Sequence, residues 1–403
     1  MGSGEAAPEP RLTRLADAAE DELQRIIPFW LGLRDSSGGG FAGEADSLGR
    51  PLWSAVKGAV LQARILWFFS QAYRRFGDPQ LLDAASWAWR FIAAHLVDPE
   101  HGGVFWAVTA DGAPAAADKH LYAQAFAIHG LAAFHQASGD PDALRLAQQL
   151  WRTVEDRAAD PDHAGYFESF SVDWRPRPNH LMGRPEAAKS FNAHFHLLEA
   201  YGALWEVWPD PALRSRIEIL ITLLTGPMLD RRWNTFRQFF QADWSALDDG
   251  GSFGHDIEGA WLIPALAGRL SASAAAAAAA AVSGLAEAVA DRAQEQDGGL
   301  ITGVDAVGRL DRSKAWWVQA EALVGFLDAF ERGGDRRFLE AAEAVWSFID
   351  RSIIDRAHGE WRWRIDAGAD APANLPKAHL WKCPYHNGRA CLELMERAKR
   401  PAG

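Results

Sequence analysis

Cysteine, basic runs and long apolar runs are all scarce in this sequence. Only Cys383 and Cys391 occur among 403 residues, eight positions apart in one expected helix, a spacing poorly suited to a disulfide. So little cysteine favours a reducing, cytoplasmic location over a secreted domain held together by disulfides. No stretch approaches about 18 uninterrupted apolar residues, so we expect no membrane-spanning helix.

Positive charge is also in deficit. The formal net charge is −12 and the chain has no basic run, which argues against nucleic acid and anionic membranes as partners. The chain has neither a phosphate-binding loop nor a Gly-x-Ser-x-Gly elbow, so no nucleotide cofactor is expected. The first ten residues are small and acidic and lack the apolar core of a signal peptide, and we expect a flexible tail over 1–10.

Hydrophobic residues make up 48% of the chain and include 19 tryptophans, enough for a large core. Glycine–aromatic turns divide this material into repeats of 61 to 63 residues, apart from one gap of 133 residues between Gly165 and Gly298. Because that gap is about two periods, we expect a sixth, degenerate turn near Trp233–Phe240. The five clear turns are Gly38–Phe41, Gly102–Phe105, Gly165–Phe167, Gly298–Leu300 and Gly359–Trp361.

Between the turns, apolar residues recur at three- and four-residue spacing, as in amphipathic helices. The tripeptides Gly77–Pro79, Gly139–Pro141 and Pro209–Pro211 each combine a helix stop with a helix start. Alternating aromatic residues in Phe105–Val108 and Trp361–Arg364 predict short hairpin strands. The twelve expected helices are 12–33, 54–77, 81–97, 119–138, 141–159, 188–208, 212–228, 256–269, 272–293, 313–332, 335–353 and 379–398.

Six helix pairs can form an open solenoid or a closed double ring. An open array needs polar capping repeats, whereas the last expected helix carries Cys391, Leu392, Leu394 and Met395 and is as apolar as an interior one. We therefore predict an all-α protein, an (α/α)6 barrel of about twelve helices with short hairpins at one end. It should form a single catalytic domain over 1–403, with the second helix of each pair inside.

One candidate motif is Asn192-Ala-His194-Phe-His196, at the start of an expected inner helix. Asn192 and His196 are four residues apart and share a helical face, while His194 points elsewhere. A polar helix start with one packed histidine is the structural alternative. A zinc site is a second alternative, but no nearby cysteine or third histidine completes the ligand set, so no metal is expected.

A second motif is Gly254-His255-Asp256-Ile257-Glu258, which looks like a loop entering a helix. His255 and Glu258 are three residues apart, close enough for the carboxylate to fix the tautomer of the imidazole. The alternative is that Asp256 and Glu258 only favour the positive end of the helix dipole.

Tryptophans share helical faces with carboxylates in two inner helices. Trp261 lies three residues after Glu258, and Trp317 lies four before Glu321. Most of the tryptophans must belong to the core, but these two pairs suit sugar stacking combined with hydroxyl binding.

A third motif, Lys382-Cys383-Pro384-Tyr385-His386-Asn387, places a proline inside the last expected helix, where it should distort the backbone beside His386. Cys383 as a nucleophile would need an activating environment that the sequence does not otherwise indicate. Arg64 is a charge in an otherwise apolar helix, and is expected either to be paired in the core or to stabilise a developing oxyanion.

Together these segments resemble the acylglucosamine 2-epimerase superfamily, and within it the branch that acts on cellobiose. The resemblance extends over nearly the whole chain, through Lys57–Ser70, Lys119–Phe126, Lys189–Tyr201, Gly254–Leu262, Trp316–Glu321 and Lys382–Arg389. It implies an (α/α)6 barrel that converts the reducing-end glucose of a β-1,4-linked disaccharide such as cellobiose or lactose to mannose. No cofactor or metal is implied, the partner is a small sugar, and the expected state is a monomer or weak homodimer.

The resemblance also implies roles for residues. His255 and His386 would be the acid–base pair at C2, His196 would help to open the pyranose ring, Arg64 would stabilise the open-chain oxygen, and Glu258 would orient His255. The residues expected to line the sugar site are Tyr122, Asn192, Trp261, Trp317, Glu321 and Trp381.

The chemistry expected from the residues agrees with this family. Ring opening gives an aldehyde that makes the C2 hydrogen removable, and two bases on opposite faces of the enediolate then suffice for inversion. One departure concerns Arg184-Pro-Glu-Ala-Ala, which stands where cellobiose-type enzymes are expected to have an acidic residue, so a monosaccharide epimerase stays open. The remaining alternatives are an aldose–ketose isomerase, a glycoside hydrolase using carboxylates such as Asp256 and Glu321, and a non-catalytic sugar-binding protein.

Overall fold

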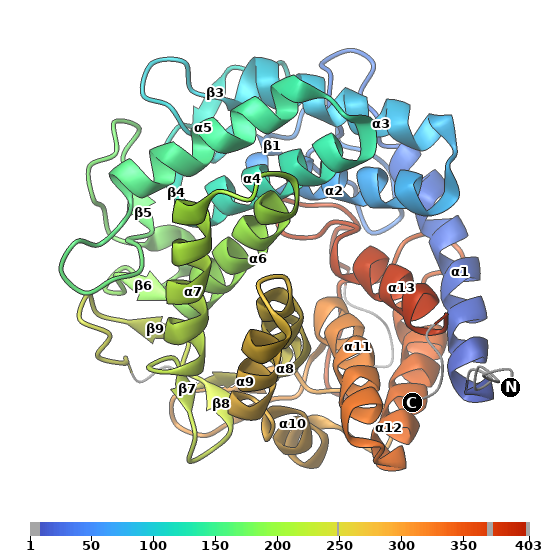
Figure 1. Ribbon diagram of the computed structural model, residues 1–403. Coiled ribbons are helices and arrows are strands. Elements are labelled where there is room, and N and C mark those ends of the chain that lie inside the picture. Colours follow the sequence, from blue (N-terminus) through green and yellow to red (C-terminus); the bar gives the residue numbers. More distant parts are fainter. Residues whose placement is uncertain (1–8, 248–249, 369–373, 400–403) are drawn as a thin grey trace, which may run out of the picture.

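Two concentric rings of helices make up the computed structural model, which describes residues 9–247, 250–368 and 374–399 (Figure 1). The predicted (α/α)6 barrel is confirmed, with the second helix of each pair inside. The inner helices are α2 (Ala59–Phe76), α4 (Leu121–Ser138), α6 (Phe191–Val207), α8 (Phe253–Gly268), α11 (Trp316–Gly333) and α13 (His386–Arg397). The outer ring holds α1 (Pro10–Leu31), α3 (Pro79–Phe91), α5 (Pro141–Arg157), α7 (Pro211–Thr225), α9 (Ala272–Ala281), α10 (Leu285–Ala293) and α12 (Arg336–Phe348).

Burial separates the two rings as their sequences predict. Every side chain of α4 from Leu121 to Phe134 is buried, because an inner helix contacts neighbours on all sides. In the outer helix α5 only four side chains are buried, and their spacing forms one apolar stripe that faces the inner ring. These four are Ala143, Ala147, Leu150 and Val154.

The turns between paired helices are capped as expected. Gly77 and Gly139 end α2 and α4 in the left-handed conformation, with φ of 71° and 75°. Asp78, Asp140 and Asp210 then cap the next helices, their carboxylates accepting hydrogen bonds from backbone N–H groups in the first turn.

Two inner helices begin five or more residues later than the sequence predicts. The expected helix 54–77 begins only at Ala59, because the preceding residues pair as a strand. The last helix begins at His386 rather than at 379, so Pro384 lies before it and causes no kink. The predicted tail 1–10 falls mostly outside the described residues, and Pro10 is already the first residue of α1.

The alanine-rich segment is two helices rather than one. By length and composition Ala272–Ala293 could cross a membrane, with a mean hydropathy of 1.5. However, a turn at 282–284 divides it into helices of 10 and 9 residues, each shorter than the roughly 20 residues that a crossing needs. Both helices pack on α8 as part of the outer ring, which accounts for their composition.

Short antiparallel strands lie at the end of the barrel where the inner helices begin. Each strand before an inner helix pairs with the loop that follows the next outer helix, which links neighbouring units. The hairpin predicted at Phe105–Val108 is confirmed, since β2 pairs with β3. The hairpin predicted at Trp361–Arg364 is wrong: β14 starts only at Arg364 and pairs with β13. The strands are β1 (Lys57–Gly58), β2 (Ala107–Val108), β3 (Pro114–Ala116), β4 (Lys119–His120), β5 (Ser169–Phe170), β6 (Lys189–Ser190), β7 (Leu229–Asp230), β8 (Thr235–Phe236), β9 (Phe239–Phe240), β10 (Gly251–Ser252), β11 (Gly303–Val304), β12 (Leu310–Asp311), β13 (Lys314–Ala315) and β14 (Arg364–Ile365).

All six expected turns are present and equivalent. In each turn, a residue shortly after the outer helix forms a backbone bridge with the residue on the other side of the turn. The degenerate sixth turn has Asn234 at φ 46°, where most of the others have glycine, because asparagine tolerates the left-handed region. The paired residues are Arg34 and Phe41, Val97 and Val104, Ala159 and Tyr166, Leu229 and Phe236, Gln294 and Leu300, and Ile354 and Trp361.

Two indole hydrogen bonds close the ring between its first and last units. Trp30 Nε1 donates to Glu360 Oε2 at 2.6 Å, and Trp361 Nε1 donates to Glu22 Oε1 at 3.0 Å. All four side chains are buried. Residues more than 300 positions apart therefore fix the register of the barrel.

At the end of the barrel where the inner helices begin, five of the six units contain an ion pair between a buried lysine and an aspartate. Each ε-ammonium group lies 2.6 to 2.9 Å from an aspartate that follows an outer helix. The pairs are Lys57 and Asp35, Lys119 and Asp98, Lys189 and Asp160, Lys314 and Asp297, and Lys377 and Asp355. In the unit that leads into α8, the position before the helix cap is Gly251, and Asp230 pairs instead with Arg237 at 3.0 Å.

Replacing Lys119 by methionine should destabilise the protein strongly. Lys119 is fully buried against Asp98, and removing one partner of a buried pair leaves an uncompensated charge, at a cost of about 3–5 kcal/mol. Urea unfolding monitored by tryptophan fluorescence measures the change. Arg145→Met, at a pair whose side chains are 70% and 63% exposed, serves as the control and should have little effect. Equal stability of the two variants would contradict a structural role for the buried pairs.

Candidate active site

Side-chain caps place the functional residues in the first turns of the inner helices. His120 Nδ1 accepts from the backbone N–H of Tyr122 at 3.1 Å, and Ser252 Oγ accepts from that of His255 at 3.3 Å. Ser190 caps α6 in the same way. Because all six inner helices begin at the same end of the barrel, these first turns surround one point on its axis.

A cavity of about 200 Å³ lies at that point. It is smaller than the roughly 300–1,000 Å³ of pockets for drug-sized ligands and suits a single sugar ring. Nine of the eleven site residues predicted from the sequence line it, and Trp316 is an addition. The lining residues are Arg64, Tyr122, Asn192, His196, His255, Glu258, Trp316, Trp317, Trp381 and His386.

His255 is held by Gln238, not by Glu258. The expected contact with Glu258 is wrong: His255 Nδ1 lies 2.7 Å from Gln238 Oε1, while Glu258 binds Arg389. Gln238 Nε2 donates to the carbonyl of Phe236 at 2.7 Å, which fixes the amide so that its oxygen faces the imidazole. Since that oxygen can only accept, the proton is on Nδ1 and Nε2 keeps its lone pair.

The neutral form of His255 is favoured by its surroundings. Burial lowers its pKa to about 3, and nearby His196 acts in the same direction. The amide of Gln238 carries no charge that would stabilise an imidazolium. His255 is therefore set up as a proton acceptor.

His386 faces a carboxylate instead. Its Nδ1 lies 2.7 Å from Glu321 Oε1. Burial raises the pKa of Glu321, so the pair retains a proton between them. Burial also lowers the pKa of His386 well below its ordinary value, so the imidazole is neutral. With the retained proton on the Glu321 carboxyl, which donates to Nδ1, the hydrogen of His386 lies on Nε2, and His386 is thus set up as a donor, the opposite of His255.

Trp261 and Glu321 lie behind the cavity rather than in its wall, contrary to expectation. Trp261 Nε1 donates to Glu321 Oε2 at 3.2 Å, and Glu321 in turn holds His386. Trp261 borders a different cavity at the opposite end of the barrel. Their geometry suits holding an imidazole rather than contacting sugar.

His196 is held by a residue of its own helix. Its Nδ1 lies 2.9 Å from Glu199 Oε2, and burial lowers the pKa of His196 to about 4. His194 points away, as expected: its two ring nitrogens are engaged by the carbonyl of Ser190 and the N–H of Tyr166. A His-x-His zinc site is therefore not formed.

Arg64 presents a buried guanidinium to the cavity without a carboxylate beside it. It is 2% exposed, and its Nη2 donates to the Tyr122 hydroxyl at 2.7 Å. Its Nη1 lies 3.7 Å from Cys383 Sγ, and the ring of Phe126 lies 4.0 Å from the guanidinium carbon. Among the described residues no carboxylate pairs with it, so its charge is available to an oxyanion.

Arg389 connects the carboxylates beneath the cavity. Its Nη1 donates to Glu199 Oε1 at 2.6 Å, and its Nη2 donates to Glu321 Oε1 at 2.7 Å and also to Glu258. Burial would raise the pKa of Glu199, but Arg389, His129 and His196 together outweigh burial, and the pKa lies well below its usual value. One guanidinium thus positions the partners of both His196 and His386.

The same carboxylates form the only group suited to a metal among the described residues. Ligand atoms of Glu258, Glu321 and His386 lie within 4.8 Å of one another. Because the Arg389 guanidinium already contacts both glutamates, a divalent cation would have to displace a fixed positive charge.

Asp256 does not face the cavity, which bears on the hydrolase alternative. It is buried and accepts from the Thr235 hydroxyl at 2.7 Å and the Phe236 N–H at 2.6 Å. Burial raises its pKa to about 7. Asp256 therefore cannot form a carboxylate pair with Glu321 across a substrate.

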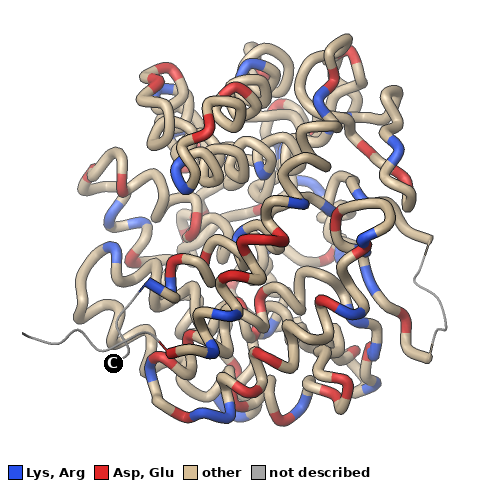
Figure 2. Tube along the Cα trace, turned by 90° about the vertical axis from the view of Figure 1, so that its right-hand side faces the viewer, with Lys and Arg blue, Asp and Glu red and all other residues tan. Residues whose placement is uncertain are grey.

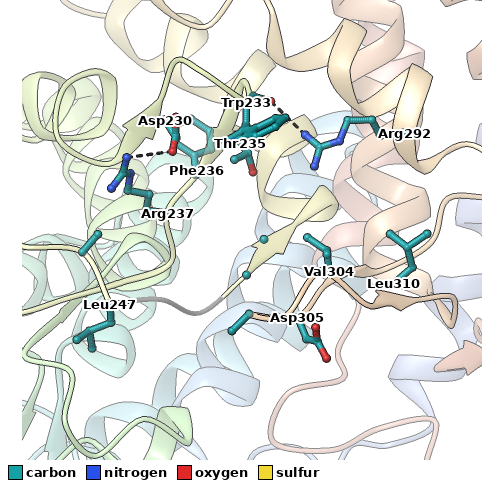
Figure 3. A pocket seen from close by; sticks show the side chains of 15 residues that line it. Asp230, Trp233, Thr235, Phe236, Arg237, Leu247, Arg292, Val304, Asp305 and Leu310 are labelled. Atoms are coloured by element: carbon teal, nitrogen blue, oxygen red, sulfur yellow. Dashed lines mark hydrogen bonds and ion pairs between the residues drawn. The ribbon is translucent and has the colours of Figure 1, made fainter.

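A larger cavity, of about 810 Å³, lies between the β7–β8 and β11–β12 hairpins (Figure 3). It coincides with the unit that lacks a buried lysine, since Gly250, Gly251 and Asp230 line it. Figure 3 shows the Arg237–Asp230 pair on one side and Val304 and Leu310 on the other. No histidine is among the described residues that line it, so it lacks the acid–base groups of the smaller cavity.

Three important residues were missed by sequence reasoning. Glu199 lies three positions after His196, so the spacing rule applied to His255 would have indicated it. Arg389 contacts three glutamates of other helices, which the spacing does not indicate. Gln238 lies within the predicted sixth turn. Its role depends on how that turn folds over α8, which the sequence does not indicate.

Comparisons with known proteins agree with this site. The family model described as N-acylglucosamine 2-epimerase (GlcNAc 2-epimerase) matches residues 39–387. A cellobiose 2-epimerase of Bacteroides fragilis is 38% identical over 375 residues, covering 92% of this chain and 96% of that protein.

Solved structures are similar over the same extent. The cellobiose 2-epimerase of Spirochaeta thermophila DSM 6192 has a TM-score of 0.89 and 38% identity, covering 97% of this chain and 98% of that one. The cellobiose 2-epimerase of Bacillus thermoamylovorans B4167 has a TM-score of 0.91 and 33% identity, covering 96% and 100%. Agreement of sequence and fold over nearly the whole length makes this chain a member of the N-acylglucosamine 2-epimerase family of carbohydrate epimerases and isomerases.

Proposed function

We propose that the protein is a cofactor-independent disaccharide 2-epimerase that converts the reducing-end glucose of cellobiose or lactose to mannose. The observation that carries this proposal is that two imidazoles at one small cavity differ in their tautomers. His255 presents a proton acceptor at Nε2, and His386 presents a proton donor there. Inversion at C2 requires such a pair, and the similarity to cellobiose 2-epimerases supports the substrate.

The walls of the cavity suit a sugar ring. The indoles of Trp316, Trp317 and Trp381 offer apolar faces for the C–H groups of a pyranose. Asn192 Oδ1 and Glu258 Oε2 are buried acceptors without a hydrogen-bond partner among the described residues. Sugar hydroxyls are the donors that would satisfy them.

His196 and Arg64 would open the ring. His196 Nε2 would take the proton of the C1 hydroxyl as the bond between C1 and the ring oxygen breaks. The Arg64 guanidinium, with the Tyr122 hydroxyl that it orients, would stabilise the negative charge on the oxygen.

Proton transfer at C2 would follow from the states of the two imidazoles. Neutral His255 would remove the C2 proton of one epimer to give the enediolate, and His386 would deliver a proton from Nε2 to the other face. The reverse reaction would exchange these roles. Glu321 would act through His386 as a positioning residue.

A disaccharide fits the dimensions of the site. A cavity of about 200 Å³ holds one ring, so the second sugar would lie at the mouth. Arg184, in the loop before β6, is held by Glu186 at 2.8 Å and lies over the Phe239 ring. This segment is where an acidic contact to the second sugar is expected, so kcat/KM should be compared between disaccharides and monosaccharides.

The two free, buried thiols accord with action in a reducing cytoplasm.

Incubation with cellobiose, lactose, glucose and mannose in D₂O, followed by NMR, tests the proposal. The expected result is a disaccharide with mannose at the reducing end and deuterium at its C2. Release of two monosaccharides would identify a hydrolase, a ketose product an isomerase, and binding without label a sugar-binding protein. A higher kcat/KM for free glucose or mannose than for cellobiose would contradict the disaccharide preference alone.

Replacing His255 and His386 singly by asparagine should give complementary defects. Each variant loses one general base, so net epimerisation should fall by about 10²-fold or more. The remaining imidazole should still exchange the C2 hydrogen of one epimer, provided that His196 opens the ring. Deuterium should therefore enter a different epimer in each variant. Substantial epimerisation by both variants would refute the two-base assignment.

Gln238 variants test the setting of His255. Gln238→Leu removes the acceptor at Nδ1 and should lower kcat/KM by about 10- to 100-fold. Gln238→Glu places a carboxylate there, which stabilises the imidazolium and raises the pKa of His255 from about 3. Since the neutral form is the base, the acid limb of the kcat/KM profile should move to higher pH. The exposed Gln241→Leu is the control, and an unchanged profile in Gln238→Glu would contradict the assignment.

A further inference from the structure

A second cavity lies at the opposite end of the barrel from the proposed sugar site. It has a volume of about 470 Å³ and is bordered by the later turns of α2, α4, α6, α8 and α13. Its walls include Trp67, His129, Glu199, Trp261 and Arg389. None of these side chains lines the sugar cavity, yet Glu199, Trp261 and Arg389 belong to the hydrogen-bond network beneath it.

Glu199 connects the two cavities. One carboxylate oxygen, Oε2, contacts His196 Nδ1 at 2.9 Å, and His196 lines the sugar cavity. The same side chain borders the far cavity. His196 and Glu199 therefore form a continuous polar path through the centre of the barrel.

His129 extends this path. It lies in α4 at the depth of Glu199, is 6% exposed, and its Nε2 is 4.0 Å from Glu199 Oε1. The face of its ring stacks on Trp67 at 5.8 Å. Neither ring nitrogen has a hydrogen-bond partner among the described residues, although buried polar atoms are normally satisfied. The nearest group that could use them is the Glu199 carboxylate.

The surroundings of His129 favour its neutral form, so that an added proton is held only transiently. Burial lowers the pKa of His129 to about 4. Glu199 acts in the opposite direction, whereas Arg269, Arg389 and Arg64 lower it further. The other neighbours that face the ring, Phe126 and Tyr385, are aromatic.

We propose that Glu199 and His129 form a proton relay that serves His196 during ring opening, an inference that rests on the proposed function. When His196 Nε2 takes the proton of the C1 hydroxyl, the proton on Nδ1 passes to Oε2 of the ionised Glu199. The carboxyl group that results turns and gives that same proton to His129 Nε2, which leaves Glu199 ionised again. His196 stays neutral, and the positive charge lies on His129 at the border of the far cavity.

The relay then runs backwards to complete ring opening. His196 Nε2 gives its proton to the ring oxygen, His129 returns a proton to Glu199, and Glu199 returns one to His196 Nδ1. The balance is the transfer of one proton from the C1 hydroxyl to the ring oxygen, with every enzyme group restored. A shift of about 1 Å brings His129 Nε2 from 4.0 Å to hydrogen-bond distance from Glu199.

Two variants of His129 test the relay. His129→Phe keeps the volume but carries no proton, and kcat for epimerisation should fall about 10-fold, less than the roughly 10²-fold for a group that transfers protons to substrate. The multi-proton solvent isotope effect on kcat of the wild type should shrink to that of a single transfer. Gln136→Ala, on the rim of the same cavity, is the matched control and should keep both values.

His129→Ala adds a readout that a structural role would not change. The space left is continuous with the far cavity, so added imidazole should enter it and restore kcat several-fold in this variant but not in His129→Phe. Activity of His129→Phe within twofold of the wild type, or no rescue of a folded His129→Ala, would overturn the relay. Wild-type epimerisation is measured first: its absence refutes the proposed function and the relay with it, whereas an active wild type with unaffected variants refutes the relay alone.

Discussion

The buried lysine–aspartate pair is the interaction on which the rest of this structure depends. Each ammonium group joins the loop after an outer helix to the strand or loop that leads into an inner helix. Lys57, for example, donates to Asp35, to the carbonyl of Gly39 and to that of Ala110. A buried charge is tolerated only when its hydrogen bonds are satisfied, so the three acceptors must be in place together. The starts of the inner helices, where the imidazoles lie, are thereby fixed relative to one another.

A second buried cation organises the floor of the site. Arg389 contacts Glu199, Glu258 and Glu321. Three carboxylates face one guanidinium group, which would leave negative charge in excess in a medium of low dielectric constant. Burial accordingly raises the pKa of both Glu258 and Glu321, since protons retained on these two leave the Arg389–Glu199 pair neutral. Figure 2 shows that acidic and basic residues elsewhere are interspersed along the chain. The cluster around Arg389 differs from them because its charged groups are buried and contact one another.

Much of the fold could be predicted because it depends on local patterns that recur. Most helix pairs share the glycine turn, the aspartate cap and the apolar spacing, and these determine where the helices begin and end. The period of these patterns also located the degenerate turn at Asn234. The cavity lining was predicted through motifs in the first turns of inner helices. What could not be predicted were contacts between units, such as Gln238 on His255 and Glu321 on His386. Helix spacing indicates which residues share a face of one helix, but not which neighbouring helix that face meets.

The unit that carries His255 lacks the lysine–aspartate pair found in the other five. Gly251 stands where other units have a lysine, and Asp230 is held by Arg237, whose side chain is 46% exposed. A half-exposed ion pair contributes little stability, and Asp230 and Arg237 both border the 810 Å³ cavity. Local opening is drawn from segments of this kind, at a lower free energy than global unfolding. On heating, the segment that orients His255 should therefore open before the barrel does, and loss of activity would precede loss of helical structure.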